Sequence, residues 1–92
     1  MRNSNPRRDQ IEIVAEILEK AKRGSKKTNI MSGCRLSYAL NKKYLQALLD
    51  SGFLDLTPDG QYIATPEGRN AIEIAEKARR TFNGFYERLR KK

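Results

Sequence analysis

Histidine is absent from the sequence, and cysteine occurs once, as Cys34, among 92 residues. A single cysteine excludes a disulfide framework and any Cys-x-x-Cys metal or redox site. Without histidine, the chain has no His-based zinc site and no Cys–His or Ser–His nucleophile pair. Its carboxylates are not spaced as an acid–base pair. We therefore predict no enzyme activity, no metal and no cofactor, and we expect Cys34 to be a small buried residue.

Long apolar runs are also lacking. None approaches the length that a membrane-spanning helix needs, and the polar start MRNSNPRRDQ lacks the apolar core of a signal peptide. We therefore expect a cytoplasmic protein that neither enters a membrane nor acts on a small-molecule substrate.

Positive charge, in contrast, is abundant. Nineteen Lys and Arg stand against eleven Asp and Glu, which gives a net charge of +8. Such an excess favours a polyanionic partner, nucleic acid first and an acidic membrane surface second. An ordinary solvated surface also explains each basic cluster taken singly. One domain is expected for a chain this short, and its apolar share of 38% allows a small core that a partner chain would stabilise.

Capping and turn residues divide the chain into elements. N-caps are expected at Asp9, Thr28, Ser37 and Thr65, and left-handed C-terminal glycines at Gly24 and Gly52. These signals predict helices over 9–23, 29–34, 38–51 and 66–90, and a hairpin of strands 54–56 and 61–64 around the turn TPDG. A short helix, a tight turn, a second helix and a two-stranded wing form the winged helix-turn-helix order. We predict a mainly α (α+β) fold with a flexible basic arm at 1–8, a winged helix-turn-helix domain at 9–68 and a dimerisation helix at 69–92.

The third helix, within LSYALNKKYLQALLDSGFL, is predicted to have an apolar side and a basic strip. The buried side is expected to hold Leu40, Leu45, Leu48 and Leu49. The opposite side carries Lys42, Lys43 and Gln46 around the small Ala39, and no acidic residue precedes Asp50. We interpret this strip as a DNA-binding surface whose lysines contact phosphates, while Gln46 can pair with an adenine edge. A solvated helix face is the alternative.

Further candidate DNA contacts flank this helix. They are Arg7, Arg8, Lys26, Lys27, Arg35, Ser37 and Tyr38. Ser37 starts the helix, where exposed N–H groups favour a phosphate, although a plain N-cap is also consistent with it. Tyr38 is expected mainly in the core, with its hydroxyl reaching outward as a second possibility, and Tyr44 is expected in the core. The two arginines of the arm can lie along DNA or belong to a disordered segment.

The run TNIMSGCRLSYALNKKYLQALLDSGFL, followed by a hairpin and by TPEG, resembles the small archaeal winged-helix DNA-binding proteins. It is similar in particular to the ten-kilodalton crenarchaeal chromatin proteins of the 10a class, over residues 11–68. The resemblance implies a third helix that recognises DNA and a last helix that pairs two subunits. It also implies a nucleoid protein that binds duplex DNA with little sequence preference. The predicted wing departs from the pattern because it carries Asp55 and Asp59 and no Lys or Arg.

Two alternative functions are weighed against this architectural one. A sequence-specific transcription regulator has the same fold. A protein-interaction module belongs to another class, and the lysine-rich strip argues against it because the centres of protein interfaces are depleted in lysine.

The last helix carries the a/d pattern of a coiled coil. Its seam is expected at Ala71, Ala75, Ala78, Phe82, Phe85 and Leu89, spaced 4, 3, 4, 3 and 4. Antiparallel pairing places an alanine against a large residue in every layer, as dense packing prefers. We therefore predict an antiparallel coiled-coil homodimer. Two alternatives remain, namely that Gly84 ends the helix and that Ala71 and Ala75 face their own domain.

Overall fold

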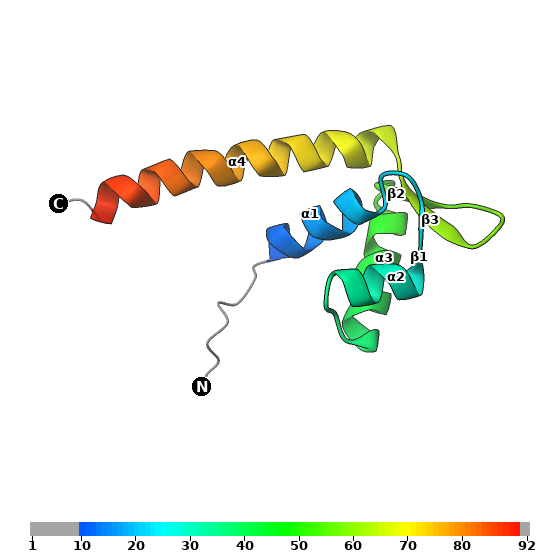
Figure 1. Cartoon of the computed structure of the whole chain (residues 1–92). Coiled ribbons are helices and arrows are strands. Elements are labelled where there is room, and N and C mark those ends of the chain that lie inside the picture. Colours follow the sequence, from blue (N-terminus) through cyan, green and yellow to red (C-terminus); the bar gives the residue numbers. More distant parts are fainter. Residues whose placement is uncertain (1–9, 91–92) are drawn as a thin grey trace.

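The computed structural model describes residues 10–90, except for the side chains of Tyr86 and Arg90. The elements are α1 (Gln10–Lys20), β1 (Ser25–Lys26), α2 (Lys27–Gly33), α3 (Tyr38–Asp50), β2 (Leu54–Leu56), β3 (Gln61–Ala64) and α4 (Pro66–Arg90). Figure 1 shows the first three helices and the sheet gathered at one end of α4, which extends away from them. The predicted mainly helical fold with a wing is confirmed. The predicted arm at 1–8 and the N-cap Asp9 lie outside the described residues.

The core lies where α1, α2, α3 and the sheet meet the first turns of α4. Its buried cluster is Ile17, Leu18, Ala21, Ile30, Cys34, Leu36, Leu45, Leu48, Leu54, Ala64 and Ile72. Cys34 is buried as predicted. Full burial of an aliphatic side chain stabilises a fold by about 1.5–3 kcal/mol. Because every element except β1 contributes to this cluster, the first three helices, the hairpin and the start of α4 form a single packed body.

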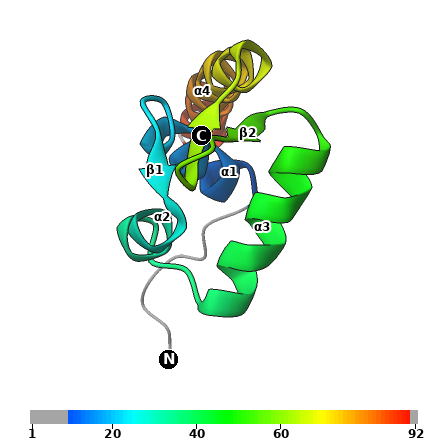
Figure 2. The same cartoon turned by 90° about the vertical axis from the view of Figure 1, so that its right-hand side faces the viewer.

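The sheet has three strands, in the order β1-β3-β2, so the prediction of a two-stranded hairpin was incomplete. In the antiparallel ladder Ser25 lies opposite Tyr62 and Lys26 opposite Gln61. A two-residue strand shows no alternation of apolar and polar residues, so the sequence pattern did not indicate it. The extra strand attaches the segment before α2 to the wing, as Figure 2 shows for β1 and its neighbours.

Two helix boundaries differ from those expected. The first helix ends at Lys20 rather than at 23, and a hydrogen-bonded turn leads to Gly24, whose φ is +96°. Thr28 is not an N-cap, since α2 begins at Lys27 directly after β1. The strand places Lys26 in extended backbone, with φ −75° and ψ 154°, and this residue takes the cap position. Pairing with the sheet therefore decides where α2 starts.

The predicted caps of α3 and α4 are confirmed. Ser37 Oγ accepts a hydrogen bond from Leu40 N at 3.1 Å. At the other end of α3, Gly52 has φ +81°, and Phe53 N donates to Leu48 O at 2.9 Å, as in a Schellman motif. Thr65 Oγ1 accepts from Gly68 N at 3.0 Å and donates to Gly52 O at 2.7 Å. One threonine hydroxyl thus joins the end of α3 to the start of α4.

The inner face of α3 is rotated from the one expected. Leu45 and Leu48 are buried as predicted, but Leu40 is 42% exposed and Tyr38 is 65% exposed, so both were wrongly assigned to the core. Asn41 takes the inner position in the first turns, with an exposed fraction of 4%. Its Nδ2 donates to Lys27 O at 3.2 Å, which ties α3 to α2. Tyr44 is partly buried against the core, close to its predicted place.

Helix α4 continues through Asn83 and Gly84 without a break, in agreement with the prediction of a helix to about residue 90. Its 25 residues span about 37 Å at 1.5 Å per residue. The alanines at its start contact α1: Ala71 and Ala75 line a shallow apolar depression, hereafter the α1–α4 groove, with Gln10, Ile11, Val14, Ala15 and Leu18. Within the described residues, no helix is long and apolar enough to cross a membrane.

Candidate nucleic-acid interface

The turn between α2 and α3 is tight because Arg35 adopts a left-handed conformation, with φ +56°. Arg35 N donates to Ser32 O at 3.2 Å and Leu36 N donates to Met31 O at 3.0 Å, the pattern of a Schellman motif. Glycine usually occupies this position, since a side chain there strains the backbone. The turn brings Leu36 back into the core and starts α3 at Ser37.

The side of α3 that faces solvent is basic. Lys42, Lys43 and Gln46 are exposed, and Ala39, with its short side chain, is exposed among them. Gln46 Nε2 donates to Asp50 Oδ1 at 3.0 Å. Recognition of adenine by glutamine needs both the amide nitrogen and the amide oxygen. The hydrogen bond to Asp50 uses one of the two N–H groups of the Gln46 amide, so it does not exclude a contact to a base.

The structure brings four of the predicted contact residues together around one depression. This α3–β3 pocket has a volume of about 170 Å³ and is lined by Lys27, Tyr38, Asn41, Lys42, Leu45, Gln46 and Tyr62. Lys26 is the neighbouring exposed residue in β1. Lysines from α2 and α3, far apart in sequence, therefore contribute positive charge to the same surface.

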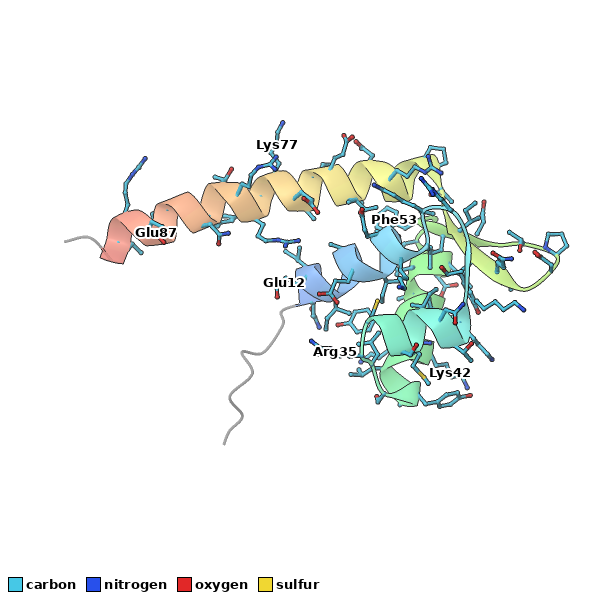
Figure 3. The ribbon with its side chains drawn as sticks, viewed as in Figure 1. Glu12, Arg35, Lys42, Phe53, Lys77 and Glu87 are labelled. Carbon is cyan, nitrogen blue, oxygen red and sulfur yellow. The ribbon has the colours of Figure 1, made fainter. Side chains whose placement is uncertain are left out.

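Arg35 lies on a different side of the helix-turn-helix. It lines a surface depression with Glu16, Glu19 and Glu76 among its neighbours, on the side of α1 and α4. Figure 3 shows Arg35 and Lys42 at opposite sides of this unit. Lys20 and Arg79 line the same depression, so the charge of Arg35 belongs to a mixed surface that is separate from the α3 strip.

The wing presents negative charge at its tip. Asp59 is fully exposed, and the hydrogen bond from the Thr57 hydroxyl holds the pKa of its carboxyl below the ordinary value of 3.8. Gln61 Nε2 also donates to Asp59 Oδ2 at 3.2 Å. The carboxylate is therefore ionised at neutral pH and repels a phosphate backbone.

Sequence reasoning missed two members of the pocket, Asn41 and Tyr62. Asn41 was assigned to neither side of α3 from the sequence, although its spacing of four and seven from Leu45 and Leu48 points inward. Arg7 and Arg8 lie outside the described residues. Among residues 10–90, no group of three or more His, Cys, Asp or Glu side chains is placed to hold a metal ion.

Comparison with known proteins agrees with this architecture. The uncharacterized protein MJ0290 of Methanocaldococcus jannaschii is 39% identical over 72 residues, which are 77% of this chain and 34% of that protein. The chain thus spans about a third of the length of this relative.

Among solved structures, Sso10a-2, a DNA-binding protein from Sulfolobus solfataricus, matches with a TM-score of 0.83 at 24% identity. The match covers 91% of this chain and 92% of that one. It confirms the fold that the resemblance to the 10a class implied. The family model described as winged helix-turn-helix matches residues 7–83. The chain belongs to the winged helix-turn-helix family.

Proposed function

We propose that this protein binds duplex DNA as a homodimer, mainly through phosphate contacts and with little sequence preference, and that it acts as an architectural protein of the nucleoid. The observation that carries the proposal is the exposed basic strip of α3, with Lys42, Lys43 and Gln46 on the solvent side of the second helix of a helix-turn-helix. The net charge of +8 and the likeness in fold to a DNA-binding protein support it.

The contact surface that we propose is centred on α3 and extends to the start of α2. Lys26 and Lys27 approach it from β1 and α2, and Ser37 and Tyr38 border it at the start of α3. Arg35, on the other side of the turn, is proposed as a contact to a flanking phosphate, and Arg7 and Arg8 as contacts of the arm. Because the wing tip is acidic, the wing is expected to lie away from the DNA backbone.

The lysines at the centre of the α3 strip, Lys42 and Lys43, favour an architectural role over a sequence-specific regulator. Phosphate contacts position a protein on a duplex without reading its sequence. A regulator would need base contacts from side chains that are free to form bidentate pairs.

The dimer is proposed from the distal half of α4. Phe82 is 55% exposed, Phe85 49% and Leu89 56%, and they follow one another at a/d spacing beyond the region that α1 covers. Large apolar side chains in a row on an exposed stripe indicate an interface. An antiparallel partner would place its Phe85 and Leu89 against the α1–α4 groove, where Ala75 and Ala71 leave room.

Salt titration on several unrelated duplexes tests the DNA proposal. The logarithm of the affinity is expected to fall linearly with the logarithm of salt concentration, with one slope for all duplexes. Replacing Lys42 and Lys43 with alanine should reduce the slope by roughly one unit for each lost contact. At 0.1 M salt two such contacts correspond to a loss of up to roughly sixtyfold in affinity, since each contributes a slope of about 0.9.

Lys77→Ala with Arg80→Ala is the matched control, because it removes the same charge from exposed positions on α4. The control is expected to weaken binding much less than the change in α3. Equal losses in both variants would mean that only net charge matters and would remove α3 from the contact surface. A strong preference for one duplex would favour the regulator instead.

Sedimentation tests the dimer. Replacing Phe82 and Phe85 with glutamate is expected to give monomers and to weaken DNA binding, because charges cannot be buried in an apolar seam without a large cost. Asn83→Glu, at an exposed position between them, is the matched control and should remain dimeric. A dimer that persists in the double variant would contradict the α4 seam.

A further inference from the structure

The lining of the α3–β3 pocket carries positive charge without any carboxylate. Lys27 and Lys42 contribute one ammonium group each, and none of the seven lining residues is Asp or Glu. Within residues 10–90, neither lysine takes part in an ion pair. The depression that contains Arg35, in contrast, mixes three glutamates with its cations. Two like charges at one pocket, with no acidic partner beside them, favour the binding of an anion.

Tyr62 supplies a hydroxyl to the same pocket from the sheet. It lies in the central strand β3, opposite Ser25 on one side and Leu56 on the other, and its ring packs against the core. Its hydroxyl is neither hydrogen-bonded to another described residue nor among the buried polar atoms that lack a partner, so solvent reaches it. Tyrosine side chains are among the groups that form hydrogen bonds with DNA phosphates. Tyr62 is therefore a candidate donor to the anion that the lysines attract.

The pocket has the size of one small anion and is held in shape. Its volume of about 170 Å³ is below the roughly 300–1,000 Å³ of drug-sized sites. It corresponds to a few water-sized groups of about 30 Å³ each, which suits a tetrahedral phosphate. Asn41 Nδ2 donates to Lys27 O at 3.2 Å and so joins the two helices that carry the lysines. Because Tyr62 is also held between two neighbouring strands, binding requires little rearrangement.

We propose that the α3–β3 pocket binds one phosphate group. The ammonium groups of Lys27 and Lys42 pair with its oxygens, and the hydroxyl of Tyr62 donates a hydrogen bond to it. The inference rests on the proposed function and sharpens it, because it makes one backbone phosphate the anchor of α3. Lys43, next to Lys42 in sequence, does not line the pocket, so it contributes charge but takes no part in this hydrogen-bonded site.

Tyr62→Phe tests the hydroxyl without removing a lysine. Duplex affinity is measured by fluorescence anisotropy over a range of salt concentrations. The variant is expected to bind about three- to tenfold more weakly at every concentration, with an unchanged salt slope, since counterion release depends on the charged groups. Tyr44→Phe is the matched control and should bind as the wild type does, because Tyr44 is a partly buried tyrosine that does not line the pocket. Wild-type affinity in Tyr62→Phe would overturn the proposal.

Single lysine variants give a second test. Lys42→Ala and Lys43→Ala each remove one charge, so each is expected to lower the salt slope by roughly one unit. In double-mutant cycles, the effects of Lys42→Ala and Tyr62→Phe on affinity should be coupled, because both residues hold the same phosphate. The effects of Lys43→Ala and Tyr62→Phe should be additive. Additivity in both cycles would contradict a shared site.

Titration with sodium phosphate, compared with sodium chloride at equal ionic strength, identifies the source of the phosphate. Competition with the duplex beyond that of chloride, and weaker in Tyr62→Phe, supports the pocket and shows that it accepts free phosphate. Dependence of duplex binding on Tyr62 without such competition supports the pocket and assigns it to the DNA backbone.

The same variants separate this inference from the proposed function. If the joint replacement of Lys42 and Lys43 weakens duplex binding but Tyr62→Phe does not, the proposed function stands and the pocket site is refuted. If the wild type binds no duplex, the proposed function fails, and the amide NMR signals of Lys42 and Tyr62 decide on the pocket. Saturable shifts with sodium phosphate that Tyr62→Phe diminishes would support it, and their absence would refute it.

Discussion

Glycine-to-alanine substitutions at two positions of α4 should change the stability of the protein in opposite directions. A Cβ atom added at Gly68 would lie 2.2 Å from Phe53 O and 3.1 Å from Phe53 C, both backbone atoms, and 3.3 Å from Leu18 Cδ2. Phe53 O also accepts the hydrogen bond from Thr65 N at 3.1 Å. At Gly84 the added atom would meet nothing within 4 Å.

The magnitudes follow from these contacts. Alanine favours a helix over glycine by about 1 kcal/mol, so Gly84→Ala should raise the free energy of unfolding by about 0.5–1 kcal/mol. At Gly68 the same gain is opposed by overpacking, which costs about 1–3 kcal/mol, and by disturbance of a hydrogen bond worth about 1 kcal/mol. Gly68→Ala should therefore destabilise the protein by about 1–3 kcal/mol.

Thermal unfolding at one fixed protein concentration measures both effects, because the midpoint of a dimer depends on concentration. For a domain of this size, 1 kcal/mol corresponds to about 4–8 °C in Tm. Gly84 occupies a c position, away from the proposed seam, so its substitution should leave the sedimentation coefficient unchanged. A Gly68→Ala protein as stable as the wild type would refute the close approach of α4 to the backbone of Phe53, just before β2.

Two other predictions concern the wing and the turn. Asp59→Asn should strengthen duplex binding a few-fold at low salt, because it removes a negative charge that repels the DNA backbone at a distance. Since the pKa of Asp59 is held below its ordinary value by the Thr57 hydroxyl, the difference between wild type and variant should stay constant from about pH 5 to 8. It should shrink only below about pH 4, where the wild-type carboxyl gains a proton; a difference that disappears near neutral pH would contradict this assignment. The free energy of unfolding of Arg35→Gly should exceed that of Arg35→Ala by about 1 kcal/mol. Both variants lack the arginine side chain, and only glycine adopts φ +56° without strain. Equal unfolding free energies from urea denaturation would show that the turn is not strained.

Much of the architecture follows from local chemistry that a sequence displays. Ser37, Gly52 and Thr65 cap helices at the positions predicted from their side chains or, for the glycine, from its backbone freedom. These effects involve residues within a few positions of one another, so they do not depend on the rest of the fold. The basic strip of α3 belongs to the same class, because Lys42, Lys43 and Gln46 share a helix face at any packing angle.

The exact face of α3 that packs inward, in contrast, could not be predicted from local sequence signals. Four leucines defined an apolar side, but Asn41 competes with Leu40 for the inner position through its hydrogen bond to Lys27 O. That acceptor is fourteen residues away in sequence, at the start of another helix. No periodicity of α3 alone contains this information.

The sequence by itself determined the order of the four helices and the hairpin, the exclusion of His-dependent chemistry, and the charge of the third helix. These properties depend on composition and on contacts between near neighbours. Tertiary structure alone decided that Ser25 and Lys26 form a strand, that Arg35 lies on the side of α1 and α4, and that Asn41 and Tyr62 complete a pocket with Lys27 and Lys42. Each of these depends on backbone or side-chain partners far apart along the chain, and such pairings are set by the packing of the whole core.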